Sequence, residues 1–319
     1  MYIDDQIKDY FDKNKICYKT VYTAPSRYMN LFVLNYNLKL AKDLGALIKK
    51  NDNMDFYITL ADESLPVIKY IKDLNKFFIY ISNGDLSLLY FNKGYINRYG
   101  LIWKYLSRSM VKHIWQNAEL SKMYDLLLGN SAFTSNLMSF IYNMPFSGYV
   151  YPPIGENIHP TNYKENTSYA IAILRNEMEP AYHYIKSIAK KINVKVIGGA
   201  NVENAENLGF IPENRLIDLY SGANVTLSLN PQEFFGYPIV ESLRCKTPVM
   251  AFNTGGASEI IKNYYNGWLI NDSKELAEKL YDIIKMDNQE MRENALKSSN
   301  NYTIEASTKK LLNYLNGVT

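Results

Sequence analysis

The feature that most constrains the fold is the alternation of short β-rich runs with helical patterns along the whole chain. Strands that alternate with helices form parallel sheets, because each crossover needs a helix to return the chain to the same edge. We therefore predict an α/β protein with doubly wound sheets. The strands expected in the second half are Ala170–Leu174, Val194–Ile197, Val225–Leu229 and Val249–Phe252.

The first half shows the same alternation. Its expected strands are Cys17–Tyr22, Asp55–Leu60, Phe77–Ser82 and Leu126–Leu128, and its expected helices are Leu31–Lys49 and Leu101–Met123. Two further helices, Ser273–Lys285 and Ile304–Leu315, are predicted from apolar residues at helical spacing near the end of the chain.

A segment rich in Pro, Gly and Asn, residues 143–168, interrupts the alternation and has the composition of a linker, with one short strand at Tyr149–Tyr151. With 319 residues, the chain is long enough for two domains. We predict a first Rossmann-like domain over residues 1–143, onto which a C-terminal helix at 304–319 packs back, and a second over residues 144–303. The two domains are expected to face a cleft.

Composition excludes several classes of protein. Three histidines and two cysteines are too few for a zinc cluster or a disulfide framework. The charged N-terminal residues do not resemble a signal peptide, and no apolar run is long enough to span a bilayer. We expect a cytoplasmic location, with any membrane contact peripheral.

Residues 223–261 carry the chemistry. A buried strand runs into a loop that ends at Gly236, and a second strand ends at Gly255 and Gly256, each followed by a helix. Ligands of open α/β sheets bind outside the carboxyl ends of the strands, where helix N-termini offer free N–H groups to phosphate. Glycine also permits close backbone approach to a ligand.

The pattern in this segment resembles glycosyltransferase family 4, a group of retaining enzymes with the GT-B fold. Members carry Glu-Gly-Phe-Gly, a second glutamate five residues later, a Pro-Val strand and Gly-Gly-x-x-Glu. This chain has Glu233-Phe234-Phe235-Gly236, then Glu241, Pro248-Val249 and Gly255-Gly256-Ala257-Ser258-Glu259, with the spacing kept. The resemblance extends to Leu208–Ile211, Asn266–Ile270, Asn130–Thr134 and Tyr151–Pro153.

The resemblance implies roles for residues of the second domain. Glu241 would bind the ribose hydroxyls of a nucleotide-sugar donor, and Glu233 the hydroxyls of the transferred sugar, since a carboxylate accepts strong hydrogen bonds. Arg175 would bind the diphosphate as a fork of N–H donors, although a surface ion pair is the alternative. The remaining contacts would come from Phe235, Gly236 and Tyr237 to sugar and phosphate, and from Phe210 and Ile211 to the base.

The same resemblance implies a hexosyltransferase-type enzyme that moves a sugar, with retention of configuration, from a UDP-, GDP- or ADP-linked donor to an acceptor hydroxyl. The acceptor would be a glycan or a lipid-linked molecule bound by the first domain. No nucleic-acid partner is expected. No Asp-x-Asp motif is present, which agrees with a metal-independent enzyme without a cofactor.

The chain departs from the family pattern at three points. Pro180 stands where members have a lysine, with Glu177 and Glu179 nearby and Lys186 as the only candidate substitute. The first domain has no glycine-rich phosphate loop. Ser26 and Arg27 are its candidate replacements, and Asp85 follows the middle strand where many members have a histidine. Asp85 is a candidate catalytic base or orienting group, and a turn role for Asn83 and Gly84 is the alternative.

Residues 98–116 form a second candidate site. No acidic residue occurs between Asp85 and Glu119, and this gap holds Lys104, Arg108 and Lys112 beside Trp103 and Trp115. A basic, aromatic helix can rest on an anionic membrane surface. The alternative is an amphipathic helix that packs its aromatic side chains inward.

Two rival functions remain open. One is a degenerate protein of the same fold that binds a nucleotide sugar without turnover, which the missing lysine motivates. The other is a different enzyme of this fold, such as a sugar-nucleotide epimerase or a phosphorylase, because a fold alone does not specify its reaction.

Overall fold

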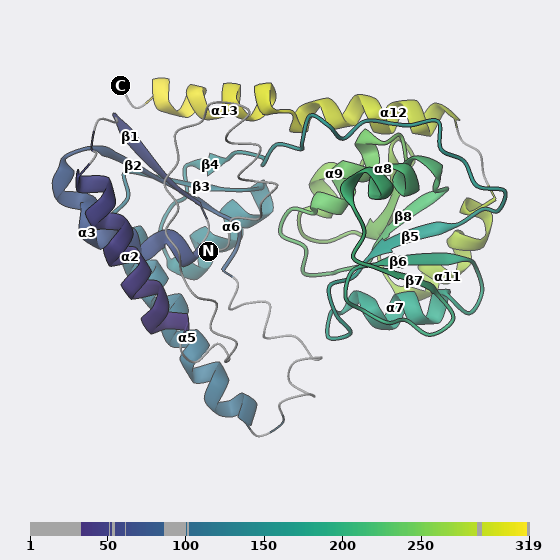
Figure 1. Ribbon diagram of the computed structural model, residues 1–319, viewed down its shortest axis with the longest axis horizontal. Coiled ribbons are helices and arrows are strands. Elements are labelled where there is room, and N and C mark those ends of the chain that lie inside the picture. The colour runs from purple at the N-terminus through teal and green to yellow at the C-terminus, as the bar shows by residue number, and fades with distance from the viewer. Residues whose placement is uncertain are drawn as a thin grey trace. The chain divides into compact units, whose positions relative to one another are not determined.

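The computed structural model describes residues 33–50, 52, 55–60, 62–85, 100, 102–285 and 289–317 (Figure 1). The predicted strand Cys17–Tyr22 and the candidate site residues Ser26 and Arg27 lie outside these residues. The described strands are β1 Phe56–Leu60, β2 Phe77–Ser82, β3 Leu126–Gly129, β4 Gly148–Tyr149, β5 Ala170–Ile173, β6 Val194–Ile197, β7 Glu206–Gly209, β8 Val225–Ser228, β9 Val249–Phe252 and β10 Gly267–Ile270.

The described α-helices are α2 Val33–Lys50, α3 Ile68–Ile71, α5 Ile102–Ser121, α6 Ala132–Tyr142, α7 Ala181–Ile188, α8 Glu213–Gly222, α9 Tyr237–Arg244, α10 Ala257–Ile260, α11 Ser273–Ile283, α12 Gln289–Ser299 and α13 Ile304–Asn316. Short 3-10 helices lie at Asp62–Val67, Lys72–Leu74 and Asn300–Tyr302.

The larger sheet has six strands in the order β10-β9-β8-β5-β6-β7, and each neighbouring pair is parallel. Counted along the chain from β5, this is the doubly wound order of a Rossmann fold, with the reversal of strand order between β5 and β8. The predicted parallel α/β architecture is therefore confirmed. The loops that follow β5 and β8 emerge side by side at the point where ligands of such sheets bind.

Both faces of this sheet are covered by helices, because neighbouring residues of its strands point to opposite sides. Ala170 and Ala172 of β5 face α7 and α11, in a cluster with Ile185, Leu276 and Leu280. The other face packs against α8 through Ile171 and Leu219, and against α9, α10 and α12 through Val249, Ile239, Ile260 and Ala295. Strand residues buried on both sides explain the continuous apolar runs in the sequence.

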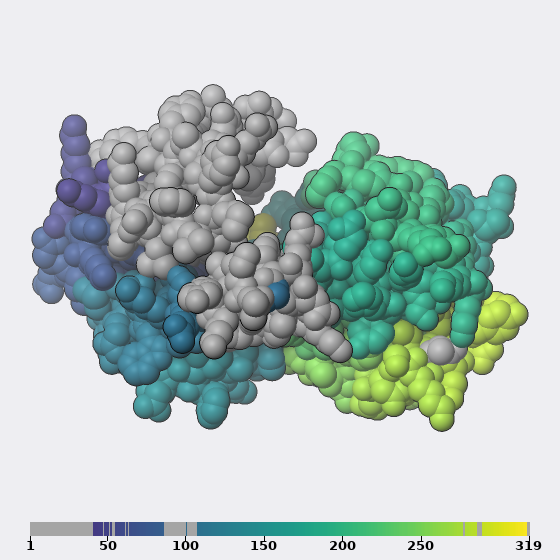
Figure 2. All heavy atoms as spheres, turned by 90° about the horizontal axis from the view of Figure 1, so that it is seen from below, coloured from purple at the N-terminus to yellow at the C-terminus, as the bar shows by residue number. Residues whose placement is uncertain are grey.

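The edge strand β7 was not among the strands predicted from the sequence. Of its residues, Glu206 to Gly209, only Leu208 has an apolar side chain and most are exposed, so no apolar pattern marks them. Edge strands are commonly polar in this way, because one side has no partner strand and faces water. Helix α12 was also not predicted. It packs against α9, and Figure 2 shows the yellow C-terminal residues beside the green residues that precede them.

The smaller sheet has the order β1-β2-β3-β4, with β3 and β4 parallel. Strand β4 belongs to this sheet although it follows residue 143, so the first sheet extends past the predicted domain boundary. Helix α13 contacts the same strand, where the Tyr314 hydroxyl accepts a hydrogen bond from the Tyr149 backbone N–H at 3.2 Å. Lys310 lies over the Tyr149 ring, 3.0 Å from its centroid.

The chain divides into two compact units, Met1–Tyr80 with Gln116–Leu126, and Ile81–Trp115 with Leu127–Thr319. In the described part of the first unit, the buried Tyr124 hydroxyl donates to Thr59 at 3.0 Å, and Tyr124 lies against Tyr80. The second unit contains all the site residues described below. The predicted domains, 1–143 and 144–303, with acceptor and donor sides, stay a prediction.

Candidate active site

The topology of the six-stranded sheet brings Arg175 and Glu233 to the same place. Arg175 follows β5 and Glu233 lies in the loop after β8, and these two strands flank the reversal of strand order. Glu233 is half-buried, and the positive charge of Arg175 acts on its carboxyl group. Two residues far apart in sequence thus lie within electrostatic reach of each other where a Rossmann fold binds its ligand.

Burial raises the pKa of Glu233 above its usual range. Arg175 opposes this shift because a positive charge favours the carboxylate, whereas Glu179 adds to it by like-charge repulsion. The backbone N–H of Phe235 also favours the ionised form. Glu233 is therefore a carboxyl group with one cation and one anion acting on it, in surroundings that disfavour charge.

The Gly255–Gly256 turn packs against the Glu233 loop. The Gly256 backbone N–H donates to the Glu233 carbonyl oxygen at 2.8 Å. A Cβ at Gly255, whose φ is +60°, would lie 2.2 Å from that oxygen, and one at Gly256 would lie 2.6 Å from the Phe234 carbonyl oxygen. We predicted from the sequence that these glycines allow a ligand to approach. The structure gives another reason for them, since the approaching group is the backbone of the Glu233 loop.

Helix α9 begins at Tyr237, directly after Gly236, whose φ of +99° turns the chain into the helix. The Phe235 side chain is buried and meets the Tyr237 ring edge-on, with centroids 5.4 Å apart. Tyr237 itself is 49% exposed. The backbone contacts predicted for Phe235, Gly236 and Tyr237 stay a prediction, and the Phe235 side chain serves the core.

Glu241 lies one turn into α9 and is half-buried. The hydroxyl of the fully buried Tyr220, on α8, donates to Glu241 Oε2 at 3.2 Å. Burial raises the pKa of Glu241, while the Tyr220 hydroxyl lowers it and the charge of Glu213 raises it. The Tyr220 contact orients the carboxylate, whose remaining lone pairs can accept hydroxyl groups of a ligand.

Phe210 and Ile211 follow β7 at the same edge of the sheet. Phe210 is 84% exposed, an unusual position for a large apolar ring, whereas Ile211 is half-buried and packs against the cluster under α8. Phe210 lies beside the turn after β6, where a Cβ at Gly199 would be 3.6 Å from its ring. An exposed ring at this edge is available for stacking, so the predicted base contact has a suitable group.

Asp85 follows β2 and is fully buried. Its Oδ2 accepts a hydrogen bond from the Tyr142 hydroxyl at 3.0 Å. The preceding Gly84 has a φ of +85°, and a Cβ there would lie 2.5 Å from the Phe234 ring. This conformation and the Phe234 ring both require glycine at position 84. The turn alternative and the catalytic role of Asp85 stay predictions.

Glu259 completes the sequence pattern and was not assigned a role. Its carboxylate accepts the backbone N–H of Ala132, at 2.9 Å, and that of Phe133, both at the N-terminus of α6. The Tyr151 hydroxyl donates to the same group at 3.1 Å. A negative charge at a helix N-terminus is stabilising. The third glutamate of the pattern thus joins α10 to α6 within the chain.

A second contact of α6 reaches the donor-side loop. The Ser131 hydroxyl, which caps α6, also lies 2.6 Å from the Phe234 carbonyl oxygen, and the Phe133 and Phe234 rings are 6.4 Å apart. Asn130–Thr134 belongs to the sequence resemblance, but no role was predicted for Ser131. A serine directly before a helical segment is typical of a helix N-cap, and this signal could have predicted its role in capping α6.

The candidate membrane helix is described only in part. The side chains of Trp103 and Lys104 lie outside the description. Arg108 and Lys112 are exposed, and Trp115 is 70% exposed. The exposed Trp115 side chain therefore does not fit the alternative, in which the aromatic side chains pack inward.

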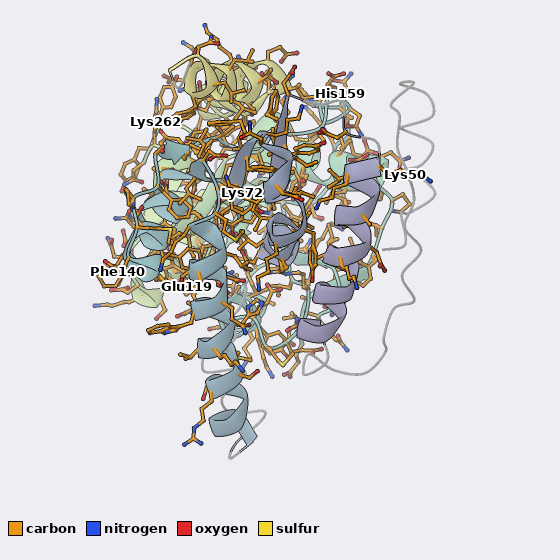
Figure 3. The ribbon with its side chains drawn as sticks, turned by 90° about the vertical axis from the view of Figure 1, so that its left-hand side faces the viewer. Lys50, Lys72, Glu119, Phe140, His159 and Lys262 are labelled. Atoms are coloured by element: carbon orange, nitrogen blue, oxygen red, sulfur yellow. The ribbon has the colours of Figure 1, made fainter. Side chains whose placement is uncertain are left out.

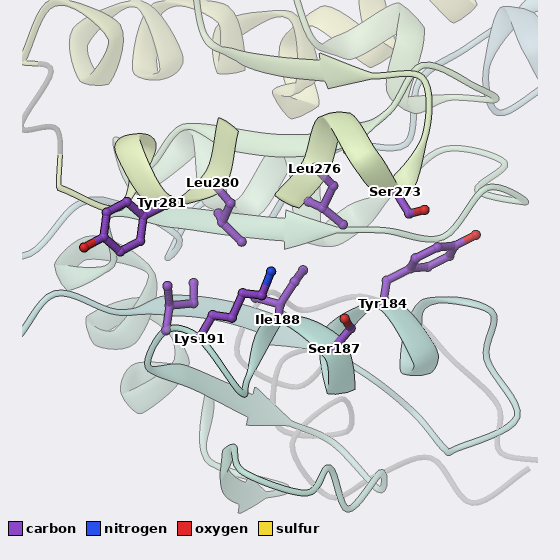
Figure 4. A pocket seen from close by; sticks show the side chains of 9 residues that line it. Tyr184, Ser187, Ile188, Lys191, Ser273, Leu276, Leu280 and Tyr281 are labelled. Carbon is purple, nitrogen blue, oxygen red and sulfur yellow. The ribbon is translucent and has the colours of Figure 1, made fainter. Parts of the chain in front are cut away.

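A hollow of about 470 Å³ lies between α7 and α11, which cover the same face of the larger sheet (Figure 4). Leu276 and Leu280 point from α11 toward Ile188 of α7. The nine side chains that line this hollow include no predicted site residue. It is an apolar gap between two helices, separate from the strand ends.

Among the described residues, no group of three or more His, Cys, Asp or Glu side chains could hold a metal ion. In the same part of the chain, no helix has the length and apolar character needed to cross a bilayer. The expectations of a metal-independent enzyme and of a cytoplasmic location stay predictions.

Comparison with known proteins tests the resemblance. Residues 182–301 match the family model "Glycosyl transferases group 1". This segment contains Glu233, Glu241 and Glu259, and it begins after Arg175. The chain is also similar over 61 residues, at 34% identity, to a D-inositol 3-phosphate glycosyltransferase of Acidothermus cellulolyticus, a match that spans 19% of this chain and 14% of that relative.

Solved structures extend the likeness to nearly the whole fold. Sucrose-phosphate synthase from Thermosynechococcus elongatus has a TM-score of 0.74 at 15% identity, covering 93% of this chain and 82% of that one. Anabaena HepE, solved in complex with UDP-glucose, has a TM-score of 0.70 at 14% identity, covering 99% and 90%. These glycosyltransferases have the GT-B fold, and the predicted GT-B architecture is confirmed.

Proposed function

We propose that this protein is a retaining glycosyltransferase of family 4, which moves a hexose from a nucleotide sugar to an acceptor hydroxyl. The observation that carries this proposal is that Arg175 and Glu233 follow the two strands at the switch point of the six-stranded sheet, near enough for the charge of Arg175 to act on the Glu233 carboxyl group. The match of residues 182–301 to a glycosyltransferase family supports it.

The proposed chemistry breaks the bond between the anomeric carbon and the diphosphate oxygen. The oxygen of the acceptor hydroxyl forms the new bond to the anomeric carbon, and the hydroxyl proton passes to the leaving diphosphate. Negative charge grows on the leaving diphosphate, and the always-protonated Arg175 would stabilise it. Glu233 and Glu241 would accept hydrogen bonds from the sugar and the ribose. The donor is a UDP-, GDP- or ADP-sugar. We propose that neither a metal nor a cofactor takes part. HepE, whose structure holds UDP-glucose, makes the uridine donor the first to test.

The test is turnover with a panel of UDP-, GDP- and ADP-sugars, following release of the nucleoside diphosphate. We expect one donor to be consumed, with a loss of about 100-fold or more in Glu233→Ala and Arg175→Ala. Lys262→Ala serves as a control, because Lys262 is an exposed residue (labelled in Figure 3) that contacts a neighbouring tyrosine ring. Turnover that survives in both site variants would exclude the proposed site.

A second candidate is a binding protein without turnover. Pro180 at the lysine position and the ion pair of Arg175 with Glu179 favour it, since both reduce the positive charge available to a diphosphate. Nucleotide binding without turnover of any donor, with glycans and lipid-linked acceptors supplied, would favour this reading. Conversion of the donor sugar to its epimer would favour the epimerase.

We propose a lipid-linked acceptor reached by peripheral contact of residues 98–116 with the cytoplasmic membrane surface. Support comes from α5, where Arg108, Lys112 and Trp115 are exposed at helical spacing. Phe140, on α6 and labelled in Figure 3, is a further exposed aromatic side chain, at 84% exposure. Basic residues beside interfacial aromatic rings suit an anionic bilayer.

Flotation with vesicles of anionic lipid at low salt tests this contact. We expect binding that weakens as salt is raised and that falls in the Arg108→Glu, Lys112→Glu variant, because the attraction is screened over about 10 Å at ~0.1 M salt. Glu119→Lys, on the same helix, is the matched control and should not weaken binding. Absence of flotation at low salt would remove the membrane contact and leave the glycan acceptor.

A further inference from the structure

The contact between Glu179 and Arg175 is the best-defined interaction of a predicted site residue. Glu179 Oε1 accepts two hydrogen bonds from the same residue, from the Arg175 backbone N–H at 3.0 Å and from its Nε–H at 2.9 Å. The two side chains differ in exposure, since 14% of the Glu179 side chain is exposed and 70% of that of Arg175. The carboxylate is therefore the fixed partner, and the rest of the guanidinium faces solvent.

The turn that carries Glu179 is held by further bonds. Asn176 Oδ1 accepts the Met178 backbone N–H at 2.9 Å, and the Tyr182 backbone N–H donates to the Glu179 carbonyl oxygen at 3.0 Å. Glu177 Oε1 accepts the Asn201 backbone N–H at 3.2 Å. Both acidic residues that the sequence seemed to add as uncompensated charge thus have partners within the chain.

The geometry of a guanidinium decides what this contact leaves available. Its five N–H donors are planar, with one on Nε and four on the two Nη atoms. Because Nε is bound to Glu179, the end that carries both Nη groups is directed away from the carboxylate. An arginine fixed in this way loses less conformational freedom when its fork meets a phosphate.

We propose that Glu179 is a positioning residue, which holds Arg175 by its Nε–H so that the two Nη groups face the diphosphate of the donor. This inference rests on the proposed function. It also accounts for the missing lysine at Pro180, because a fixed arginine fork takes over part of the anion binding. The opposite interpretation is competition, in which Glu179 must release Arg175 before a diphosphate can bind.

The two interpretations predict opposite changes in diphosphate affinity when the Glu179 carboxylate is removed. If Glu179 positions Arg175, removing its carboxylate weakens diphosphate binding. If it competes, removal of its negative charge strengthens binding. The bond to the Arg175 backbone N–H favours positioning, since it fixes the carboxylate independently of where the guanidinium lies.

Calorimetric titration of the full chain with UDP, GDP and ADP, and with uridine, guanosine and adenosine, separates them. For the diphosphate that binds, we expect Glu179→Ala to weaken binding about tenfold and Glu179→Gln, which keeps an acceptor for Nε–H, less than about threefold. Affinity for the matching nucleoside should stay within about twofold, because it has no phosphate. In the Arg175→Ala background, Glu179→Ala should have no further effect.

Glu177→Gln is the matched control, because Glu177 lies in the same turn and bonds Asn201 instead of Arg175. It should bind the diphosphate as the unchanged protein does, and thermal unfolding of each variant verifies that it is folded. The positioning role alone would be overturned if Glu179→Ala bound the diphosphate as tightly as the unchanged protein, or more tightly. It would also be overturned if Glu179→Ala weakened binding as much in the Arg175→Ala background as in the unchanged protein. Failure of the unchanged protein to bind any nucleotide would overturn the proposed function with it.

Discussion

The carboxyl ends of the two sheets differ in what they expose. At the six-stranded sheet, Arg175, Phe210 and Tyr237 are exposed, and Glu233 and Glu241 are half-buried. At the described end of β2 in the four-stranded sheet, Asp85 is fully buried and bonded to Tyr142. Polar groups that bind a ligand must be reachable, whereas a buried carboxylate with an internal partner is already satisfied.

This difference separates residues available to a ligand from residues that stabilise the fold. The glutamates at the larger sheet have raised pKa values because they are partly desolvated without full pairing, a condition found at functional sites. Glu259 belongs to the same sequence pattern, yet it is bound to two backbone N–H groups and a hydroxyl. Membership of a motif therefore does not by itself make a residue part of a binding site.

The largest effect that we expect on stability comes from Glu259→Ala. The substitution leaves the N–H groups of Ala132 and Phe133 and the Tyr151 hydroxyl without their acceptor, so the free energy of unfolding should fall by about 3 kcal/mol. Urea unfolding measures it. Tyr151→Phe removes one of the three bonds and should cost about 1 kcal/mol. A loss below about 0.5 kcal/mol in Glu259→Ala would show that these contacts do not stabilise the fold.

A smaller effect should appear with pH. The raised pKa values of Glu233 and Glu241 mean that these groups lose their charge, as pH falls, before an ordinary glutamate of pKa 4.5 does. Donor affinity should therefore fall by up to about tenfold per pH unit below the raised pKa. Stability should change in the opposite direction: a raised folded-state pKa favours the protonated native state at low pH, and this contribution is lost as pH rises.

Titration of donor affinity and of unfolding between about pH 8 and pH 5 tests both signs. A glutamine cannot ionise. Glu233→Gln and Glu241→Gln should therefore each reduce the pH dependence of donor affinity and the pH dependence of the unfolding free energy. A donor affinity that falls only where an ordinary glutamate titrates would contradict the partial desolvation of these two groups.

The smallest effect should come from Asp85→Asn. An amide can still accept the Tyr142 hydroxyl, so nucleotide affinity should stay within about twofold and the unfolding free energy within about 1 kcal/mol. Nucleotide titration and urea unfolding measure these quantities. A loss of donor turnover with unchanged nucleotide affinity would restore Asp85 as a catalytic residue and break the contrast between the two sheet edges.

Much of the fold could be predicted because its signals are local. The strands β2, β6 and β9 have the predicted bounds, since strands buried on both faces are short runs composed mainly of apolar residues. Strand β7 was missed because its polar residues carry no such pattern. The candidate residues Arg175, Glu233 and Glu241 were predicted through a resemblance. Ser26 and Arg27, the candidates to replace the glycine-rich loop of the first domain, lie outside the described residues.

By itself the sequence determined the alternation of strands and helices, the spacing of Glu233, Glu241 and Glu259, and the glycines at the turns between them. Only the tertiary structure decided which of these groups meet. It showed that Gly255 and Gly256 accommodate the Glu233 loop, that Glu259 binds α6, and that Glu179 holds Arg175. The reason is physical: spacing records local geometry, whereas a side chain's partner depends on segments that are distant in sequence and adjacent only after folding.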